Sequence, residues 1–224
     1  MSRLTDEAGD ELLNLGAGRL HPRGAVLIRQ GADGSHVHVL RRASRSTSAF
    51  VKVTAHLENG TEALLGIRIG GDIVGELAVL GHRERVATVT TCSALIAHTI
   101  PADAFMAFLR RRPDAWEAVS LMIADRLDWA NRRRLDYAGH DVSTRIARVI
   151  VDIIDLYGYQ LAGGHFHGVS LSQPELGSLV GASKESTAKA IRGLREMGLI
   201  ETRYRRVIVS DVASLRSVAQ LTGR

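Results

Sequence analysis

The stretch from residue 172 to residue 206 holds the polar side chains whose types and spacing point most directly to chemistry. Ser172 is followed three residues later by Glu175, which is the pattern of a helix N-cap with a capping box. Gly181 then ends the helical spacing of apolar residues in this first helix. Ser183 is predicted to cap a second helix. Two short helices joined by so tight a turn predict a helix-turn-helix, in which the second helix enters the major groove of DNA.

Polar side chains cluster on the first two turns of that second helix and on the hairpin predicted after it. Lysine can donate to guanine O6 and N7, glutamate can accept from cytosine N4, and serine can do either or contact a phosphate. Arginines between the short apolar runs 199–200 and 207–209 predict a wing that contacts phosphates and fixes register. The residues predicted to contact DNA are Ser172, Gln173, Ser183, Lys184, Glu185, Ser186, Lys189, Arg203, Arg205 and Arg206. The alternative is a solvated charged face on an ordinary pair of helices.

The positive charge of the chain is concentrated around this module. Residues 1–109 carry eleven basic and eleven acidic side chains, whereas residues 170–224 carry nine basic and five acidic ones, within a total net charge of +5. A localised excess of this kind predicts a polyanionic partner, here double-stranded DNA. The single cysteine, Cys92, excludes an internal disulfide framework. Because no apolar run approaches 18 residues and the N-terminus lacks a signal-peptide core, we expect a cytoplasmic protein with no membrane partner.

The elements that position these groups follow from the periodicity of the apolar residues. Residues 1–15 predict a short amphipathic helix, and short apolar runs separated by glycine and polar turns then predict strands at 25–29, 37–40, 50–54, 63–69, 86–91 and 95–100. Evenly spaced short strands are typical of an antiparallel roll. The predicted fold class is α+β: an N-terminal antiparallel β-roll (jelly-roll-like), a long dimerisation helix and a C-terminal winged helix-turn-helix. The expected domain boundaries are 1–110, 111–140 and 141–224.

The predicted long helix, from residue 113 to about 138, carries an apolar stripe. Its members recur at three- and four-residue steps and predict a seam between two copies of the helix in a homodimer: Trp116, Val119, Ile123, Leu127 and Ala130. The alternative is a monomeric helix packed on its own domain. Asp141 predicts the cap of the next helix, which begins the DNA-binding domain.

One segment of the predicted roll has residues suited to an anionic, sugar-bearing ligand. Gly75 followed by Glu76 and a short helical turn presents backbone N–H groups that suit an anion. The Glu76 carboxylate could accept a sugar hydroxyl, and Arg85 could neutralise a phosphate.

Taken together, the GELAVL and RVATV motifs, the long helix, the DVSTRIA hinge at 141–147 and the helix-turn-helix resemble the CRP/FNR family of bacterial transcription regulators. The resemblance covers nearly the whole chain in the family's order. It implies a cyclic-nucleotide-binding-type sensor, a homodimer on a palindromic operator, allosteric control by a ligand, and RNA polymerase as a further partner. Carried over position by position, it implies a ligand site formed by Gly75, Glu76, Leu77, Ala78, Arg85, Val86, Ala87 and Asn131.

The sequence departs from the cAMP-binding members of the family at several positions. Val86 stands where they have serine or threonine, and Ala130 where a threonine helps to hold adenine. Lys184 and Lys189 replace arginines, and lysine lacks the bidentate fork. The resemblance implies a cyclic nucleotide as effector, and these departures leave open whether it is cAMP or another one. The alternatives are a ligand-independent regulator with a degenerate pocket, or a protein–protein interaction module with only non-specific DNA contacts.

Two histidine pairs raise the question of a metal site. His36 and His38 alternate on a predicted strand, so their side chains share a face, but Arg41 and Arg42 follow where a cupin would supply a glutamate. His165 and His167 lie in a glycine-rich loop without a third ligand nearby. We therefore predict no metal, and no spacing of serine, histidine or carboxylates predicts catalysis.

Overall fold

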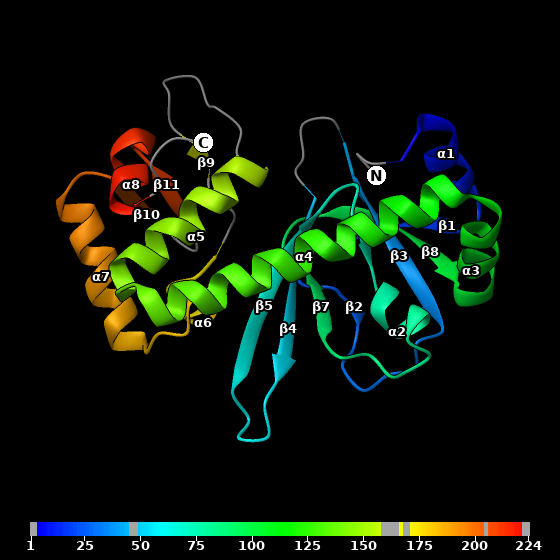
Figure 1. Ribbon diagram of the computed structural model, residues 1–224, viewed down its shortest axis with the longest axis horizontal. Helices are drawn as coiled ribbons and strands as arrows, with labels where there is room; N and C mark the ends of the chain where they lie inside the picture. The colour runs from blue at the N-terminus through cyan, green and yellow to red at the C-terminus, as the bar shows by residue number, and fades with distance from the viewer. Residues whose placement is uncertain (1–3, 45–48, 158–165, 168–170, 204–205, 221–224) are drawn as a thin grey trace. The chain divides into compact units, whose positions relative to one another are not determined.

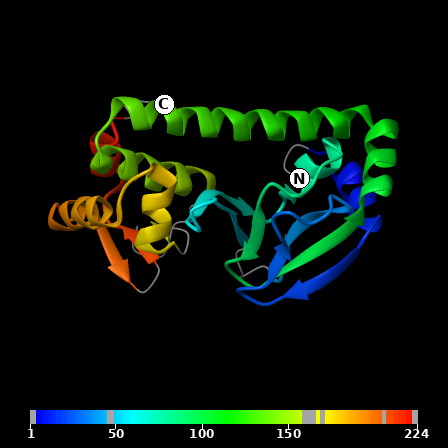
Figure 2. The same cartoon turned by 90° about the horizontal axis from the view of Figure 1, so that it is seen from below.

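The structure, a computed structural model, describes residues 4–44, 49–157, 166–167, 171–203 and 206–220 (Figure 1). The chain divides into two compact units, residues 1–127 and residues 128–224. The long helix α4 (Pro113–Gly139) begins in the first unit, ends in the second and is unbroken (Figure 2). The segment expected to be a separate dimerisation helix is thus shared between the two units.

The N-terminal unit is an antiparallel roll, as predicted. Its two four-stranded sheets have the strand orders β1-β8-β3-β6 and β2-β7-β4-β5, and all their pairs are antiparallel. The elements are α1 (Asp6–Asn14), β1 (Ala17–His21), β2 (Val26–Ile28), β3 (His36–Arg42), β4 (Phe50–His56), β5 (Glu62–Ile69), β6 (Ile73–Val74), α2 (Glu76–Leu80), β7 (Thr88–Thr91), β8 (Leu95–Pro101) and α3 (Ala102–Arg111).

Alternation along β3 explains how the roll builds two cores. Val37 and Val39 point to one face and pack with α1, α3 and the first turns of α4. Leu40 points to the opposite face, where it joins apolar residues of both sheets, among them Val51 and Val89. The first core attaches the helices to the roll, and the second fills the space between the sheets, beside the candidate ligand pocket.

Several elements of the roll were not predicted or begin elsewhere. The strands β1 and β6 were missed, because β1 is mostly exposed and β6 is only two residues long. The helix α3 was missed as well. The strand expected from residue 86 begins at Thr88, which places Val86 and Ala87 before β7. The arginine- and serine-rich run at 41–48 (RRASRSTS) predicts a hairpin loop, and its last four positions lie outside the described residues.

The C-terminal unit contains the predicted helix-turn-helix and the strands that follow it. Its elements after α4 are α5 (Val142–Tyr157), β9 (Phe166–His167), α6 (Gln173–Val180), α7 (Lys184–Glu196), β10 (Ile200–Arg203), β11 (Arg206–Val209) and α8 (Val212–Val218). The three strands form one antiparallel sheet in the order β10-β11-β9. The cap predicted for α5 is confirmed, because the Asp141 carboxylate accepts a hydrogen bond from the Thr144 N–H at 2.8 Å. Across the described part of the chain, no helix has the length and hydropathy to cross a bilayer.

The apolar stripe of α4 is only partly available for a seam between two protomers. Trp116 and Leu127 are 46% and 60% exposed, and Ala130 is exposed as well. Val119, in contrast, is only 4% exposed, because it belongs to the core cluster of the roll, and Ile123 packs against the same cluster. The assignment of Val119 to an intersubunit seam was therefore wrong, and its side chain is used inside its own domain.

Candidate functional sites

A pocket in the N-terminal unit brings together residues 75–78 and 85–87 of the predicted ligand site, which are called the cassette below. It is lined by Ile28, Val53, Arg68, Val74, Gly75, Glu76, Leu77, Ala78, Arg85, Val86, Ala87, Val89 and Arg126. Seven of the eight residues predicted to contact a ligand are in this wall. The eighth, Asn131, belongs to the C-terminal unit, and its contact with a ligand stays a prediction.

Gly75 is required by the turn that opens the cassette. Its φ is +90°, in the left-handed region, where a residue with a side chain would be strained. A Cβ at this position would lie 2.6 Å from the Arg85 Nη1 atom and 2.9 Å from the Ile28 Cδ1 atom. Both the backbone conformation and the close approach of the arginine therefore demand glycine.

Arg85 is buried beneath this turn and holds it in place. Its Nη1 donates to the Gly75 carbonyl at 2.7 Å, its Nε to the Asp33 carbonyl at 3.1 Å, and its Nη2 to the His36 carbonyl. Burial lowers the pKa of the guanidinium, and the nearby charge of Glu76 opposes that shift. The arginine expected to neutralise a phosphate thus also ties the turn at Gly75 to the segment 33–36.

The Glu76 carboxylate is held by an arginine that sequence reasoning missed. Glu76 is 3% exposed, and its Oε1 accepts a hydrogen bond from the Arg126 Nη1 at 2.6 Å. Arg126, on α4, also donates from Nη2 to the Ile73 carbonyl at 2.8 Å. One signal was present in the sequence: position 126 follows Ile123 by three residues, and residues three apart share a helix face. The ion pair of Arg126 was nevertheless not predicted, because its partner Glu76 lies 50 residues away in the sequence.

The histidines His36 and His38 share the face of β3 opposite to Val37 and Val39. Their Nε2 atoms are 3.2 Å apart, and the His38 Nε2 is also 3.2 Å from the Leu27 carbonyl oxygen. The His38 Nδ1 lies 3.1 Å from the Thr99 hydroxyl. A neutral His38 that donates from Nε2 and accepts at Nδ1 satisfies these contacts. No group of three or more histidine, cysteine or carboxylate side chains within the described ranges is placed to hold a metal ion.

Because His38 is buried, we expect the free energy of unfolding to depend on pH. Burial, together with the charge of His36, lowers the pKa of His38 to about 4 from 6.5. Between these two pH values the unfolded chain binds a proton that the folded chain does not, so stability falls as pH decreases from about 6.5 to about 4. We expect His38→Gln to remove up to about 3 kcal/mol of this decrease. Urea unfolding at a series of pH values from 7 to 4 measures this loss of stability. Identical losses in the wild type and the variant would show that His38 is not its cause.

In the C-terminal unit, the caps predicted for the helix-turn-helix are confirmed. The Ser172 hydroxyl accepts from the Glu175 N–H, and the Glu175 carboxylate accepts from the Ser172 N–H at 2.7 Å, which completes the capping box. The Ser183 hydroxyl accepts from the Ser186 N–H at 3.1 Å at the start of α7. The apolar residues that recur at helical spacing in the two helices are buried: Leu176, Leu179, Val180, Ile191 and Leu194. Met197 continues the same spacing and is predicted to lie on the inner face, but it is 54% exposed because α7 ends at Glu196.

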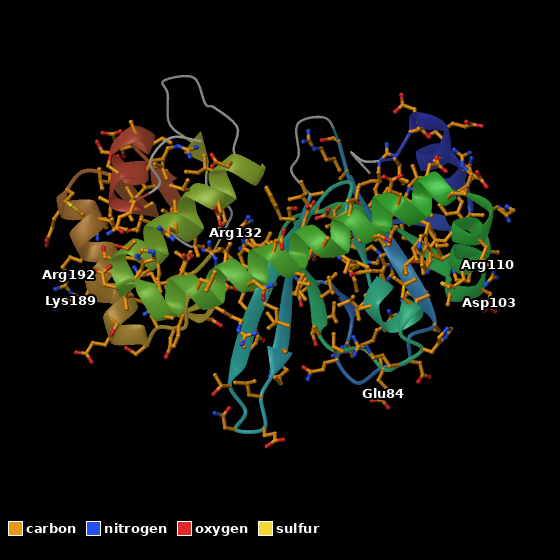
Figure 3. All side chains as sticks on the ribbon, in the orientation of Figure 1. Glu84, Asp103, Arg110, Arg132, Lys189 and Arg192 are labelled. Carbon is orange, nitrogen blue, oxygen red and sulfur yellow. The ribbon has the colours of Figure 1, made fainter. Side chains whose placement is uncertain are left out.

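The first turns of α7 present the polar face that was predicted. Ser183, Lys184, Glu185 and Lys189 are exposed, as is Gln173 at the start of α6. Lys189 and Arg192 both extend outward from α7, and Arg192 is a further exposed cation that was not predicted (Figure 3).

Other residues of that prediction are committed to the fold or lie outside the described side chains. The Ser172 and Ser186 hydroxyls take part in the helix caps, the latter accepting from the Ser183 hydroxyl at 3.0 Å. Arg203 ends β10 and Arg206 begins β11, and the structure describes their backbones only. Arg205 lies outside the described residues.

A buried arginine fixes the turn between α6 and α7. The Arg145 Nη1 donates to the Val180 carbonyl at 2.7 Å, and its guanidinium lies 4.9 Å from the centre of the Tyr137 ring. Gly181, with φ +63°, ends α6, and a Cβ there would lie 3.1 Å from a Tyr137 ring atom. The last turns of α4, the first turn of α5 and the turn of the helix-turn-helix therefore meet at one contact.

Charges buried between α4 and α5 reinforce the same region. Asp136 is buried and pairs with Arg133 at 3.2 Å and Arg148 at 2.5 Å, while Arg133 also pairs with Asp152 at 2.7 Å. Burial raises the pKa of Asp152 and lowers that of Arg133, with each partner's charge opposing the shift. The Arg148 Nε donates to the Ala219 carbonyl and so ties α5 to the end of α8.

Comparison with protein families matches both units in the expected order. A cyclic nucleotide-binding domain matches residues 19–112, and a Crp-like helix-turn-helix domain matches residues 144–218. The chain belongs to the CRP/FNR family. It is a CRP-like transcription regulator that carries a cyclic-nucleotide-binding domain and a helix-turn-helix domain. The predicted α+β fold class is confirmed as well.

Curated relatives of the regulator are bacterial. It is 28% identical over 190 residues to the CRP-like cAMP-activated global transcriptional regulator of Mycobacterium tuberculosis, covering 85% of this chain and 82% of the relative. It is 26% identical to the cAMP-activated global regulator CRP of Escherichia coli, over 84% of this chain and 87% of that protein.

Solved structures share the fold. The c-di-GMP responsive global regulator CLP of Xanthomonas campestris superposes with a TM-score of 0.76 at 20% identity, covering 92% of this chain and all of that one. A CRP/FNR-family regulator of Thermus thermophilus gives a TM-score of 0.74 at 20% identity with the same coverage.

Proposed function

We propose that this regulator is a homodimer that binds palindromic operators sequence-specifically and whose DNA affinity is set by a cyclic nucleotide in the roll. The observation that carries the proposal is the exposed polar face of α7, with Lys184, Glu185 and Lys189 displayed on a helix whose inner face is buried. A helix N-terminus of this kind, after a tight turn, suits base edges in the major groove. RNA polymerase is the further partner proposed.

Exposed apolar residues of α4 support the homodimer. Trp116, Leu121 and Leu127 are exposed on a helix of 27 residues. Large exposed apolar side chains are common at interfaces between copies of a chain. In a twofold dimer each protomer would contribute one α7 helix, and the two helices would bind half-sites that lie about one turn of DNA apart.

The pocket of the roll supports control by a cyclic nucleotide. Its wall combines a glycine turn, a buried carboxylate and buried arginine with apolar residues, which suits a phosphate, a sugar and a base. The curated relatives in Mycobacterium tuberculosis and Escherichia coli are named as cAMP-activated regulators. In this proposal the ligand binds one arrangement of the units more tightly and so shifts a population of states.

A ligand-independent regulator is the second candidate. It is favoured by the polar groups of the cassette that are already engaged within the protein: Glu76 is paired with Arg126, and Arg85 donates to three backbone carbonyls. In that case the cassette stabilises the roll instead of binding a nucleotide.

A gel shift with genomic fragments tests the function. The full chain is incubated with the fragments at two salt concentrations, with cAMP, with cGMP and without nucleotide. Selective retention of a palindromic fragment that increases with one nucleotide supports the proposal, and selective retention that no nucleotide changes favours the second candidate. Equal retention of all fragments would instead favour a protein–protein interaction module with non-specific DNA contacts.

Lys184→Ala is expected to lower the ratio of operator affinity to random-DNA affinity by about tenfold, because a base-edge donor is lost. The matched control is Arg110→Ala, which removes one exposed positive charge from α3 of the roll (Figure 3). Fluorescence anisotropy with labelled duplexes measures both ratios. An equal fall in the two variants would show that Lys184 acts only through net charge.

A further inference from the structure

The pocket carries an arginine that belongs to neither the cassette nor the long helix. Arg68 lies on β5 and lines the pocket together with Val53 of β4. In the ladder between β4 and β5, Arg68 is directly opposite Val51, and Val53 is opposite Gly66. Directly opposite residues share a face of the sheet. Because Val51 is fully buried in the core between the sheets, the register directs Arg68 toward the interior of the roll.

Gly66 provides the space in which this side chain lies. A Cβ at Gly66 would be 2.8 Å from the Arg68 Nη1 atom, so the guanidinium runs back along its own strand over the glycine. In that position its Nη1 donates to the Ile67 carbonyl at 2.7 Å. The guanidinium therefore lies against the pocket wall, where a ligand would meet it.

Arg68 and the cassette are on different parts of that wall. In the sheet order β2-β7-β4-β5, two strand spacings separate β5 from β7, or about 10 Å at about 4.8 Å per spacing. Val86 and Ala87 of the cassette come just before β7. A nucleotide whose phosphate and sugar contact Gly75, Glu76 and Arg85 would therefore extend its base toward β4 and β5.

A guanidinium at the base end of a pocket distinguishes the two purines. Guanine presents two adjacent acceptors, O6 and N7, which match the paired donors of arginine, whereas adenine presents the N6 amino donor beside N7. Val53 next to Arg68 supplies an apolar contact for the ring in either case.

We propose that Arg68 is a specificity-determining residue and that it selects a guanine cyclic nucleotide over the adenine one. The inference rests on the proposed function, since it assumes that a cyclic nucleotide binds in the roll. The full-length wild type is expected to bind cGMP at least about tenfold more tightly than cAMP, which is the discrimination that one bidentate arginine–guanine contact provides.

Calorimetric titration of the full chain with cGMP and cAMP tests the proposal. Arg68→Leu is expected to bring the ratio of the two affinities close to one mainly by weakening cGMP, and Arg68→Lys to restore only part of the ratio because lysine lacks the fork. The control Lys52→Leu changes a cation on β4 that alternates with Val51 and Val53 and pairs with Glu62 on the other face. It is expected to leave the ratio unchanged.

Two results overturn the selectivity while leaving the sensor intact: wild type that binds cAMP as tightly as cGMP, or an Arg68→Leu variant that keeps the wild-type ratio. Binding of neither nucleotide by a chain that still selects an operator overturns the ligand part of the proposed function, and the inference with it. These failures are distinguishable because the first two give measurable heats and the last does not.

Discussion

Arg126→Met is expected to lower the free energy of unfolding of the N-terminal unit by about 3–5 kcal/mol, the range for breaking a buried ion pair by removing one partner. The Glu76 carboxylate is 3% exposed, and its Oε1 lies 2.6 Å from the Arg126 Nη1. Without Arg126 this charge stays buried without its counter-ion, and the Ile73 carbonyl loses a donor at 2.8 Å. Methionine fills much of the same volume, so the loss is electrostatic more than steric.

A double-mutant cycle separates the pair from its surroundings. Glu76→Gln alone keeps an acceptor for Arg126 and is expected to destabilise less. In the combination of Arg126→Met with Glu76→Gln the buried charge is gone, so most of the stability lost in Arg126→Met should return. Urea unfolding followed by circular dichroism measures the four proteins. Additive losses would mean that the two side chains are not coupled, and that the cassette glutamate is held by other contacts.

Arg145→Met is expected to destabilise the C-terminal unit by about 3 kcal/mol and to reduce its preference for operator over random DNA. The charged hydrogen bond to the Val180 carbonyl contributes about 1.5–3 kcal/mol. The contact with the Tyr137 ring, which is 64% exposed, adds about 0.5–1 kcal/mol. Because that carbonyl immediately precedes the turn at Gly181, its release should loosen the angle between α6 and α7. Loss of this preorganisation should weaken specific binding more than non-specific binding.

Anisotropy titrations and urea unfolding are both needed for this variant. Arg134→Met removes an exposed arginine from α4 in the same unit and is the matched control, expected to change stability by less than about 0.5 kcal/mol. Retention of wild-type operator preference in a folded Arg145→Met protein would show that the contact stabilises the unit without positioning α7.

Residues close together in the sequence were sufficient to predict the helix caps and the order of the main elements. Ser172 with Glu175, and Ser183 with Ser186, lie within one helical turn of each other, so caps can be recognised without knowledge of the fold. The same applies to the short helical turn after Gly75, which a local motif predicted and which the structure contains as α2. The order of roll, long helix and helix-turn-helix was also predictable, because periodicity changes from two to 3.6 residues along the chain.

The tertiary structure alone decided which charged and apolar side chains meet. Arg126 reaches Glu76 across 50 residues, Arg145 reaches Val180 across 35, and Arg68 faces the pocket only because of its register against Val51. Val119 shares the spacing of Trp116 and Leu127 but is buried in the roll. Spacing along a helix or strand fixes which residues share a face, but the partner opposite that face is set by packing between elements distant in the sequence.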